Sequence, residues 1–134
     1  MMQPEKIIVR LVVSSKRLSP DSIASLSGIK FDRQWREGDK VPIGEARYKE
    51  DGCLLESGLS RDRPIEQQLE HLFQRVDRHF DGLRRLAKDC TLEVVCIVYF
   101  YTANTSLRIS AADIDRCSRI GAALAFDLYG LAEK

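Results

Sequence analysis

Apolar residues recur at intervals of three and four between positions 65 and 86, and this is the clearest periodic pattern in the chain. Eight residues share the stripe: Ile65, Leu69, Leu72, Phe73, Val76, Phe80, Leu83 and Leu86. A period near 3.6 places them on one face of a helix. Pro64 suits the first helical position. The pattern therefore predicts a long helix from about Arg63 to Lys88 that buries this stripe against the rest of the protein.

Three β-rich segments supply a second face for that helix to cover: Lys6 to Val13, Thr91 to Tyr101, and Ala122 to Tyr129. Because side chains alternate along a strand, one parity of each segment shares a face. That parity predicts the sheet side of the core: Ile7, Val9, Leu11, Val13, Leu92, Val94, Cys96, Val98, Phe100, Leu124, Phe126 and Leu128. The dipeptide Asp51-Gly52, between positions 45–50 and 53–57, predicts a hairpin turn.

Two shorter helices are predicted in matching positions. Ser19 and Ser110 can each cap a helix that follows a strand, and Gly28 and Gly121 can end those helices. In both, apolar residues follow the serine by four and by seven positions: Ile23 and Leu26, which share one face, and Ile114 and Cys117. In the second helix we expect four residues to face inward: Ala111, Ile114, Cys117 and Ile120. The two halves therefore resemble duplicated βαβ units. Ser106 to Ile109 could add a short strand before the second helix.

Composition bounds the class of protein. The chain has 134 residues, the usual size of one domain, so we predict a single domain over 1–134. Lys and Arg total 21 and Asp and Glu total 20, a balance that argues against bulk binding to nucleic acid or an anionic membrane. No apolar run is long enough to span a bilayer and no signal peptide is seen, so a cytoplasmic location is expected. The cysteines form no Cys-x-x-Cys pair and are expected to be free thiols: Cys53, Cys90, Cys96 and Cys117.

Short motifs spread along the chain resemble a known family. They include Ser15, Leu18-Ser19, Ile23, Gly28-Ile29, Asp32, Trp35, Gly38-Asp39, Leu55-Glu56-Ser57-Gly58-Leu59 and Asp127-Leu128-Tyr129. From about Ile7 to Leu131 the chain resembles the bacterial family catalogued as domain of unknown function 4279. The resemblance implies an α+β fold and small stand-alone bacterial proteins, and it implies no activity. The chain departs from the family at Gly52-Cys53, where the resemblance leads us to expect a tryptophan.

The residue types used in catalysis do not form a motif. His71 and His79 lie eight residues apart on the predicted long helix, about 12 Å along its axis, too far to share one metal. No serine sits in a nucleophile motif, and no glycine-rich phosphate loop is present. We therefore predict no catalytic residue, no cofactor and no metal site, and the sequence favours a non-enzymatic role.

A contact surface is the best functional prediction. The strand parity opposite the core carries Arg10, Tyr99, Tyr101, Asp127 and Tyr129. A two-layer fold leaves such a face open, and tyrosine beside apolar residues is typical of an interface. Trp35, the one tryptophan, could be a recognition residue beside its arginines. The alternative is that it packs at the edge of the core, and its segment or the hairpin could cover the open face.

The sequence thus predicts a two-layer α+β sandwich, with a mixed sheet of five to seven strands and three helices mainly on one face. The expected function is a non-catalytic protein-binding or regulatory module, with an immunity-type inhibitor as one form of it. Its partner would be an unidentified protein, or a second copy in a homodimer. Two alternatives stay open: a small enzyme with an unrecognised pocket, and single-stranded RNA binding by tyrosines on the sheet face.

Overall fold

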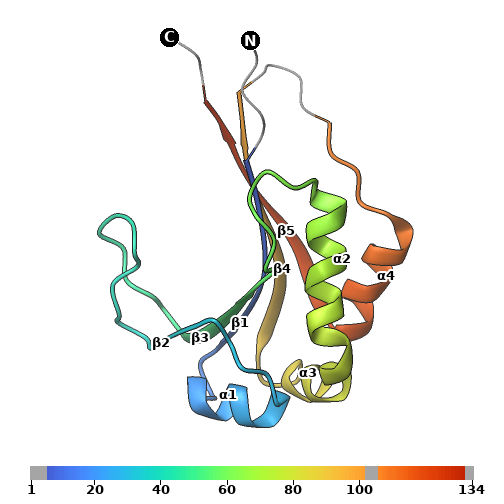
Figure 1. Ribbon diagram of the computed structural model, residues 1–134. Coiled ribbons are helices and arrows are strands. Elements are labelled where there is room, and N and C mark those ends of the chain that lie inside the picture. Colours follow the sequence, from blue (N-terminus) through green and yellow to red (C-terminus); the bar gives the residue numbers. More distant parts are fainter. Residues whose placement is uncertain (1–5, 102–105, 132–134) are drawn as a thin grey trace.

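The protein has two layers, a β-sheet and a set of helices (Figure 1). The computed structural model describes residues 6–101 and 106–131. The sheet has five strands, which are β1 (Lys6–Ser15), β2 (Arg33–Trp35), β3 (Asp51–Glu56), β4 (Thr91–Phe100) and β5 (Ala122–Gly130). Their order across the sheet is β2-β3-β1-β4-β5. Strand β1 runs antiparallel to β3 and β4, and β2 antiparallel to β3, whereas β5 runs parallel to β4. The predicted α+β class and mixed sheet are confirmed.

The helices lie on one side of this sheet (Figure 1): α1 (Pro20–Ser27), α2 (Ile65–Val76), α3 (Phe80–Leu86) and α4 (Ala111–Ile120). Between helices and sheet lies the core, to which β1 contributes Ile7, Val9, Leu11 and Val13, and β4 contributes Leu92, Val94, Cys96 and Val98. The alternation read from the sequence therefore gives the correct core face for the two central strands.

Both predicted caps are confirmed. The Oγ atoms of Ser19 and Ser110 each accept a hydrogen bond of 3.1 Å from a backbone N–H three residues on, and both helices end at a left-handed glycine. The two units differ in topology, because β3 lies between β1 and β2, whereas β5 pairs directly with β4. Of the four residues of α4 expected to face inward, Cys117 and Ile120 are buried, but Ile114 is about half exposed and Ala111 is exposed. On α1, Ile23 is buried and Leu26 is about half exposed.

The predicted hairpin turn at Asp51-Gly52 is wrong. Both residues lie inside β3, and Gly52 has no positive φ. The structure needs glycine there for another reason. A Cβ on Gly52 would come within 2.3 Å of the Trp35 ring, so only glycine lets the indole lie flat against the strand. The connection between β2 and β3 is instead formed by positions 36–50, which we call the arm. Its two sides meet at a β-bridge between Lys40 and Arg47.

The predicted long helix is interrupted. A 3₁₀ turn, η1 (Asp77–His79), separates α2 from α3. The apolar stripe continues across the turn, but the axis changes so that α3 packs on α1. At this contact a Cβ on Gly82 would lie 2.7 Å from the carbonyl oxygen of Ser27. The glycine that weakens the helix in isolation is therefore the residue that permits the close approach of α3 to α1.

Strand β5 departs from prediction in its exposure. Phe126 and Leu128 lie on the helix side, as the alternation predicts, since Phe126 pairs with buried Cys96. They are nevertheless 39% and 58% exposed, because α4 covers only part of this edge strand. Ser106 to Ile109, predicted as a short strand, has no regular structure. Among the described residues, no helix combines the length and apolar character that crossing a membrane would require.

Candidate contact surface

The face of the sheet away from the helices is the candidate site. Cross-strand pairing aligns its side chains in rows, with Val12 between Leu54 and Glu93, and Arg10 between Glu56 and Val95. Further along β1, Ile8 lies opposite Ile97. The strand residues here are mostly half-buried rather than open, since their neighbours shield them. The face is therefore a largely apolar floor with a few charges in it.

One end of the floor is walled by aromatic rings. Trp35 lies over Gly52 and stacks on Tyr48, with ring centroids 4.6 Å apart and planes 15° apart. Arg33 donates a hydrogen bond of 2.7 Å to the Tyr48 hydroxyl, and its guanidinium lies 5.5 Å from the centre of the Trp35 ring. Trp35 is only 8% exposed. The stack fixes the start of the arm against the open face.

A groove of about 420 Å³ lies between this wall and the floor. Its lining consists of Val12, Ser14, Lys16, Trp35, Tyr48, Lys49 and Glu50. The floor comes from β1, and the wall comes from β2 and the arm. The groove is thus apolar at its base, with two ammonium groups and one carboxylate available around it.

The centre of the floor holds an ion pair between Arg10 and Glu56, with Nη2 and Oε1 3.0 Å apart. Arg10 is 22% exposed on its side chain, and its Nε is buried with no hydrogen-bond partner among the described residues. The pair keeps the charge of the floor balanced. It also leaves one donor of Arg10 without an acceptor.

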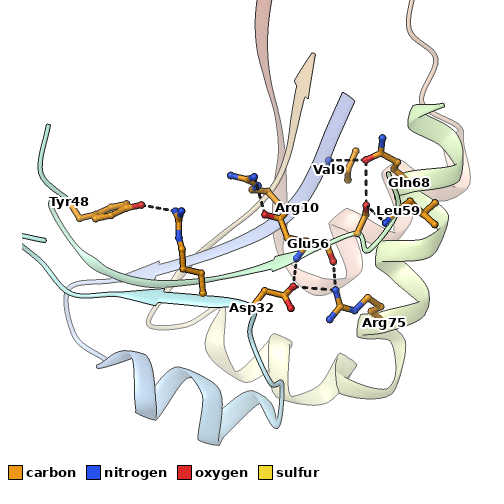
Figure 2. A network of polar contacts seen from close by, with 10 residues as sticks. Val9, Arg10, Asp32, Tyr48, Glu56, Leu59, Gln68 and Arg75 are labelled. Atoms are coloured by element: carbon orange, nitrogen blue, oxygen red, sulfur yellow. Dashed lines mark hydrogen bonds and ion pairs between the residues drawn. The ribbon is translucent and has the colours of Figure 1, made fainter. Parts of the chain in front are cut away.

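At the end of β3, Glu56 also takes part in a wider polar network with Asp32 and Arg75 (Figure 2). The carboxylate of Asp32 accepts from the Glu56 backbone N–H at 2.7 Å and from Nη1 of Arg75 at 3.2 Å. Arg75 also donates to the Glu56 carbonyl oxygen. A loop, a strand end and a helix therefore meet at two charged side chains. These contacts hold β3 in place rather than present a reactive group.

Gln68 completes the edge of β1 where β3 has ended. Its side chain is buried on α2, accepts from the Val9 N–H at 3.2 Å and donates to the Ile7 carbonyl oxygen at 2.7 Å. The backbone N–H of Ser57 donates a hydrogen bond of 3.0 Å to the Val9 carbonyl oxygen. Together with the Arg61 carbonyl oxygen, which accepts from the Ile7 N–H at 2.8 Å, these groups replace the ladder bonds of a missing strand. The segment Leu55–Leu59, one of the motifs of the family resemblance, contributes Ser57 to this edge.

Tyrosines occupy the opposite end of the floor. Tyr99 of β4 stacks on Tyr129 of β5, with ring centroids 5.1 Å apart and planes 18° apart. Tyr129 is 49% exposed, and Asp127 beside it on the same face is exposed. Tyr101 lies just beyond the end of β4 and is half-buried.

The six predicted surface residues therefore do not form one cluster. Along β1, the rows of Trp35 and of Tyr99 are eight residues apart, which is about 26 Å. Arg10 lies between them. Sequence reasoning missed Tyr48, because only the folded arm brings it onto Trp35. It also missed the roles of Gln68 and Arg75, although Asp32 and Glu56, which join that network, were among the motif residues.

The cysteines face the core rather than the floor. Burial raises the pKa of Cys53 and of Cys96 to about 12 and that of Cys117 to about 11, so all three stay protonated near neutral pH. His71 directs Nδ1 at the Ser57 carbonyl oxygen instead of lying free in solvent. Within residues 6–101 and 106–131, no three His, Cys, Asp or Glu side chains gather as they would around a metal ion.

Comparison with known proteins gives one match. The model of the family described as Domain of unknown function (DUF4279) matches residues 5–131. The chain belongs to this family. No curated protein and no solved structure matches the chain. The DUF4279 match covers β1 through β5, so the network around Glu56 and the groove beside Trp35 both lie within the family domain.

Proposed function

We propose that this DUF4279 chain is a non-catalytic protein-binding module that receives an extended segment of a partner protein on its open sheet face. The groove between Val12 and the Trp35–Tyr48 stack carries this proposal. It offers an apolar base for one inserted side chain. Lys16, Lys49 and Glu50 provide charged groups for the flanking backbone and side chains.

The charge of the face favours protein over RNA. Among its strand residues Glu56, Glu93 and Asp127 are acidic and Lys6, Arg10 and Arg33 are basic, so the strands give this face no net basic charge, and Arg10 is already paired with Glu56. A polyanionic backbone needs a net basic surface. Stacked tyrosines alone would serve an apolar protein side chain as well as a base. An enzymatic reading has weaker support, because burial keeps the thiols of Cys53, Cys96 and Cys117 protonated.

A photo-reactive phenylalanine analogue placed at single positions would test the proposal in the native host. Tyr48 probes the groove, Tyr99 probes the other end of the floor, and exposed Arg85 on the helix side is the matched control. We expect a discrete cross-linked protein from position 48 and none from position 85. If the partner is a toxin, the module is an inhibitor of the immunity type.

A second variant separates binding from folding. Ser14→Glu adds a charge to the groove lining and should abolish the cross-link while the thermal melting temperature stays close to that of the parent. Replacing Tyr99 and Tyr101 with serine should weaken the complex if the segment runs the length of the floor. Labelling that is equal at positions 48 and 85, or cross-links to RNA alone, would refute a protein-binding groove.

A further inference from the structure

Strand β5 is the least covered element of the sheet. It pairs with β4 on one side, and within residues 6–101 and 106–131 no segment pairs with its outer edge. Natural sheets shield such edges with short strands, lysine, proline or bulges. Strand β5 has nine residues, no lysine, arginine or proline, and one charge, Asp127. Its outer backbone N–H and C=O groups form a ready template for another strand.

Apolar exposure concentrates at the same place. Of the seven large apolar residues exposed in the described chain, four lie on or just beyond β5: Phe126, Leu128, Tyr129 and Leu131. A fifth, Ile114, is on α4, on the opposite flank of the helix from Arg116. Arg116 contacts Glu70 of α2, so Ile114 faces away from α2. Ile114 therefore adds exposed apolar area on α4, the helix that packs against β5.

We infer that a second copy of this chain occupies the edge, with its β5 antiparallel to the first about a two-fold axis. The sequence of β5 is self-complementary in the register that pairs all nine residues. That register centres on Phe126 opposite its own copy. On the helix side it sets Leu124 opposite Leu128 of the second copy, so every pair on that side is apolar.

The open side of the same register matches large side chains with small ones. Tyr129 lies opposite Ala123 of the second copy, and Asp127 lies opposite Ala125. Moving the register by two residues toward the C-terminus would set the two Asp127 carboxylates opposite each other and shorten the ladder to seven pairs. Charge, size and length therefore favour one arrangement. The result would be a continuous ten-stranded sheet with both helical layers on one side.

Register-specific cross-linking tests the pairing with the full chain. In Phe126→Cys the two introduced thiols face each other across the axis, so mild oxidation should link most of the protein as a dimer. In Leu128→Cys the thiols of the two copies are about 13 Å apart, four residues along the strands, and should not link. Leu128 is the more exposed position, so random collision would give the opposite order. Equal or reversed linking overturns the register.

The oligomeric state supplies the second measurement. Sedimentation should give twice the mass of the chain, and Phe126→Lys, which sets two ammonium groups opposite each other, should raise the dimer dissociation constant about tenfold or more. The matched control is Ile43→Lys, an apolar residue 87% exposed at the tip of the arm, which should leave the dimer unchanged. A parent that is monomeric at every concentration overturns the inference, as does an unaffected Phe126→Lys dimer. The groove plays no part in this contact, so either proposal can fail without the other.

Discussion

Strands β1 and β5 are of similar length, yet in the described part of the chain β1 has hydrogen-bonding partners along both edges and β5 along one edge only. Strand β1 has a strand on each side, and where β3 ends, the buried amide of Gln68 takes over the bonds of its backbone. Within residues 6–101 and 106–131, strand β5 has one neighbour, and Leu128 is 58% exposed on the side that the helices should cover. The contrast shows that this fold can satisfy a difficult strand edge with its own residues. The bare edge of β5 therefore supports our proposal that a second copy of the chain pairs there.

The largest expected difference between the two strands is in packing. Leu72→Ala, in the helix that packs on β1, should lower the free energy of unfolding by about 2–5 kcal/mol, because it leaves a cavity. Leu128→Ala, on β5, should cost under about 0.5 kcal/mol at low protein concentration, because little area is lost from the folded monomer. Urea unfolding of both variants measures the difference. Equal losses would show that β5 is as well packed as β1.

A smaller loss is expected when the bonds at the edge of β1 are removed. Gln68→Leu keeps the volume but leaves the Val9 N–H and the Ile7 carbonyl without a partner, which should cost about 1–3 kcal/mol. Its neighbour Gln67 is exposed, so Gln67→Leu is the matched control and should change little. Amide hydrogen exchange at Val9 should quicken in the first variant alone. Unchanged protection at Val9 would contradict the role given to Gln68.

Next in size is a clash on the open side of the sheet. Gly52→Ala should destabilise the protein by about 1–3 kcal/mol, since its methyl group would occupy the place of the Trp35 ring. With Trp35→Ala already present, the same change should become neutral or stabilising, because alanine is preferred to glycine in a strand. A double-mutant cycle of thermal or urea unfolding gives the coupling. Additive effects would mean that the indole does not require this glycine.

Near neutral pH the thiols beside β1 should have the smallest effect of all, but they should make the stability depend on pH in the alkaline range. Cys53 and Cys96 lie opposite Val13 and Val9 on the two neighbouring strands, and burial raises the pKa of each to about 12. An unfolded thiol ionises near pH 9, so between about pH 9 and 12 the unfolded state releases protons first and stability falls. Below pH 8 these thiols should have no effect. Cys53→Ala should flatten the alkaline slope measured by urea unfolding, and an unchanged slope would contradict this assignment.

Local rules explain what could be predicted from the sequence. A capping serine with a closing glycine identifies α1 and α4, because both signals act within one helical turn. Alternation identifies the core face of β1 and β4 for the same reason. Such local signals do not show which distant part of the chain packs against a given strand or helix. Alternation assigns Leu128 to the helix side, but it cannot show that α4 stops short of it.

Glycine explains two of the errors. Asp51-Gly52 has the composition of a turn, yet the glycine serves the approach of Trp35 to a strand, and composition does not distinguish these uses. Gly82 in the same way permits the contact of α3 with Ser27 and goes with the break between α2 and α3. For the candidate surface, alternation correctly predicted that Arg10 and Tyr99 lie on the side of the sheet away from the helices. The Trp35–Tyr48 wall could not be predicted in this way, since it depends on how a fifteen-residue arm folds back.

The stack of Trp35 on Tyr48 also gives the protein an optical reporter. Trp35 is the one tryptophan in the chain, so all indole emission comes from the wall of the groove. An occupant of the groove would change the polarity around this ring and should shift the emission maximum. Contact at β5, three strands away from β3, should leave the spectrum as it is. One titration followed by tryptophan fluorescence can therefore distinguish a molecule that enters the groove from one that joins the sheet at its edge.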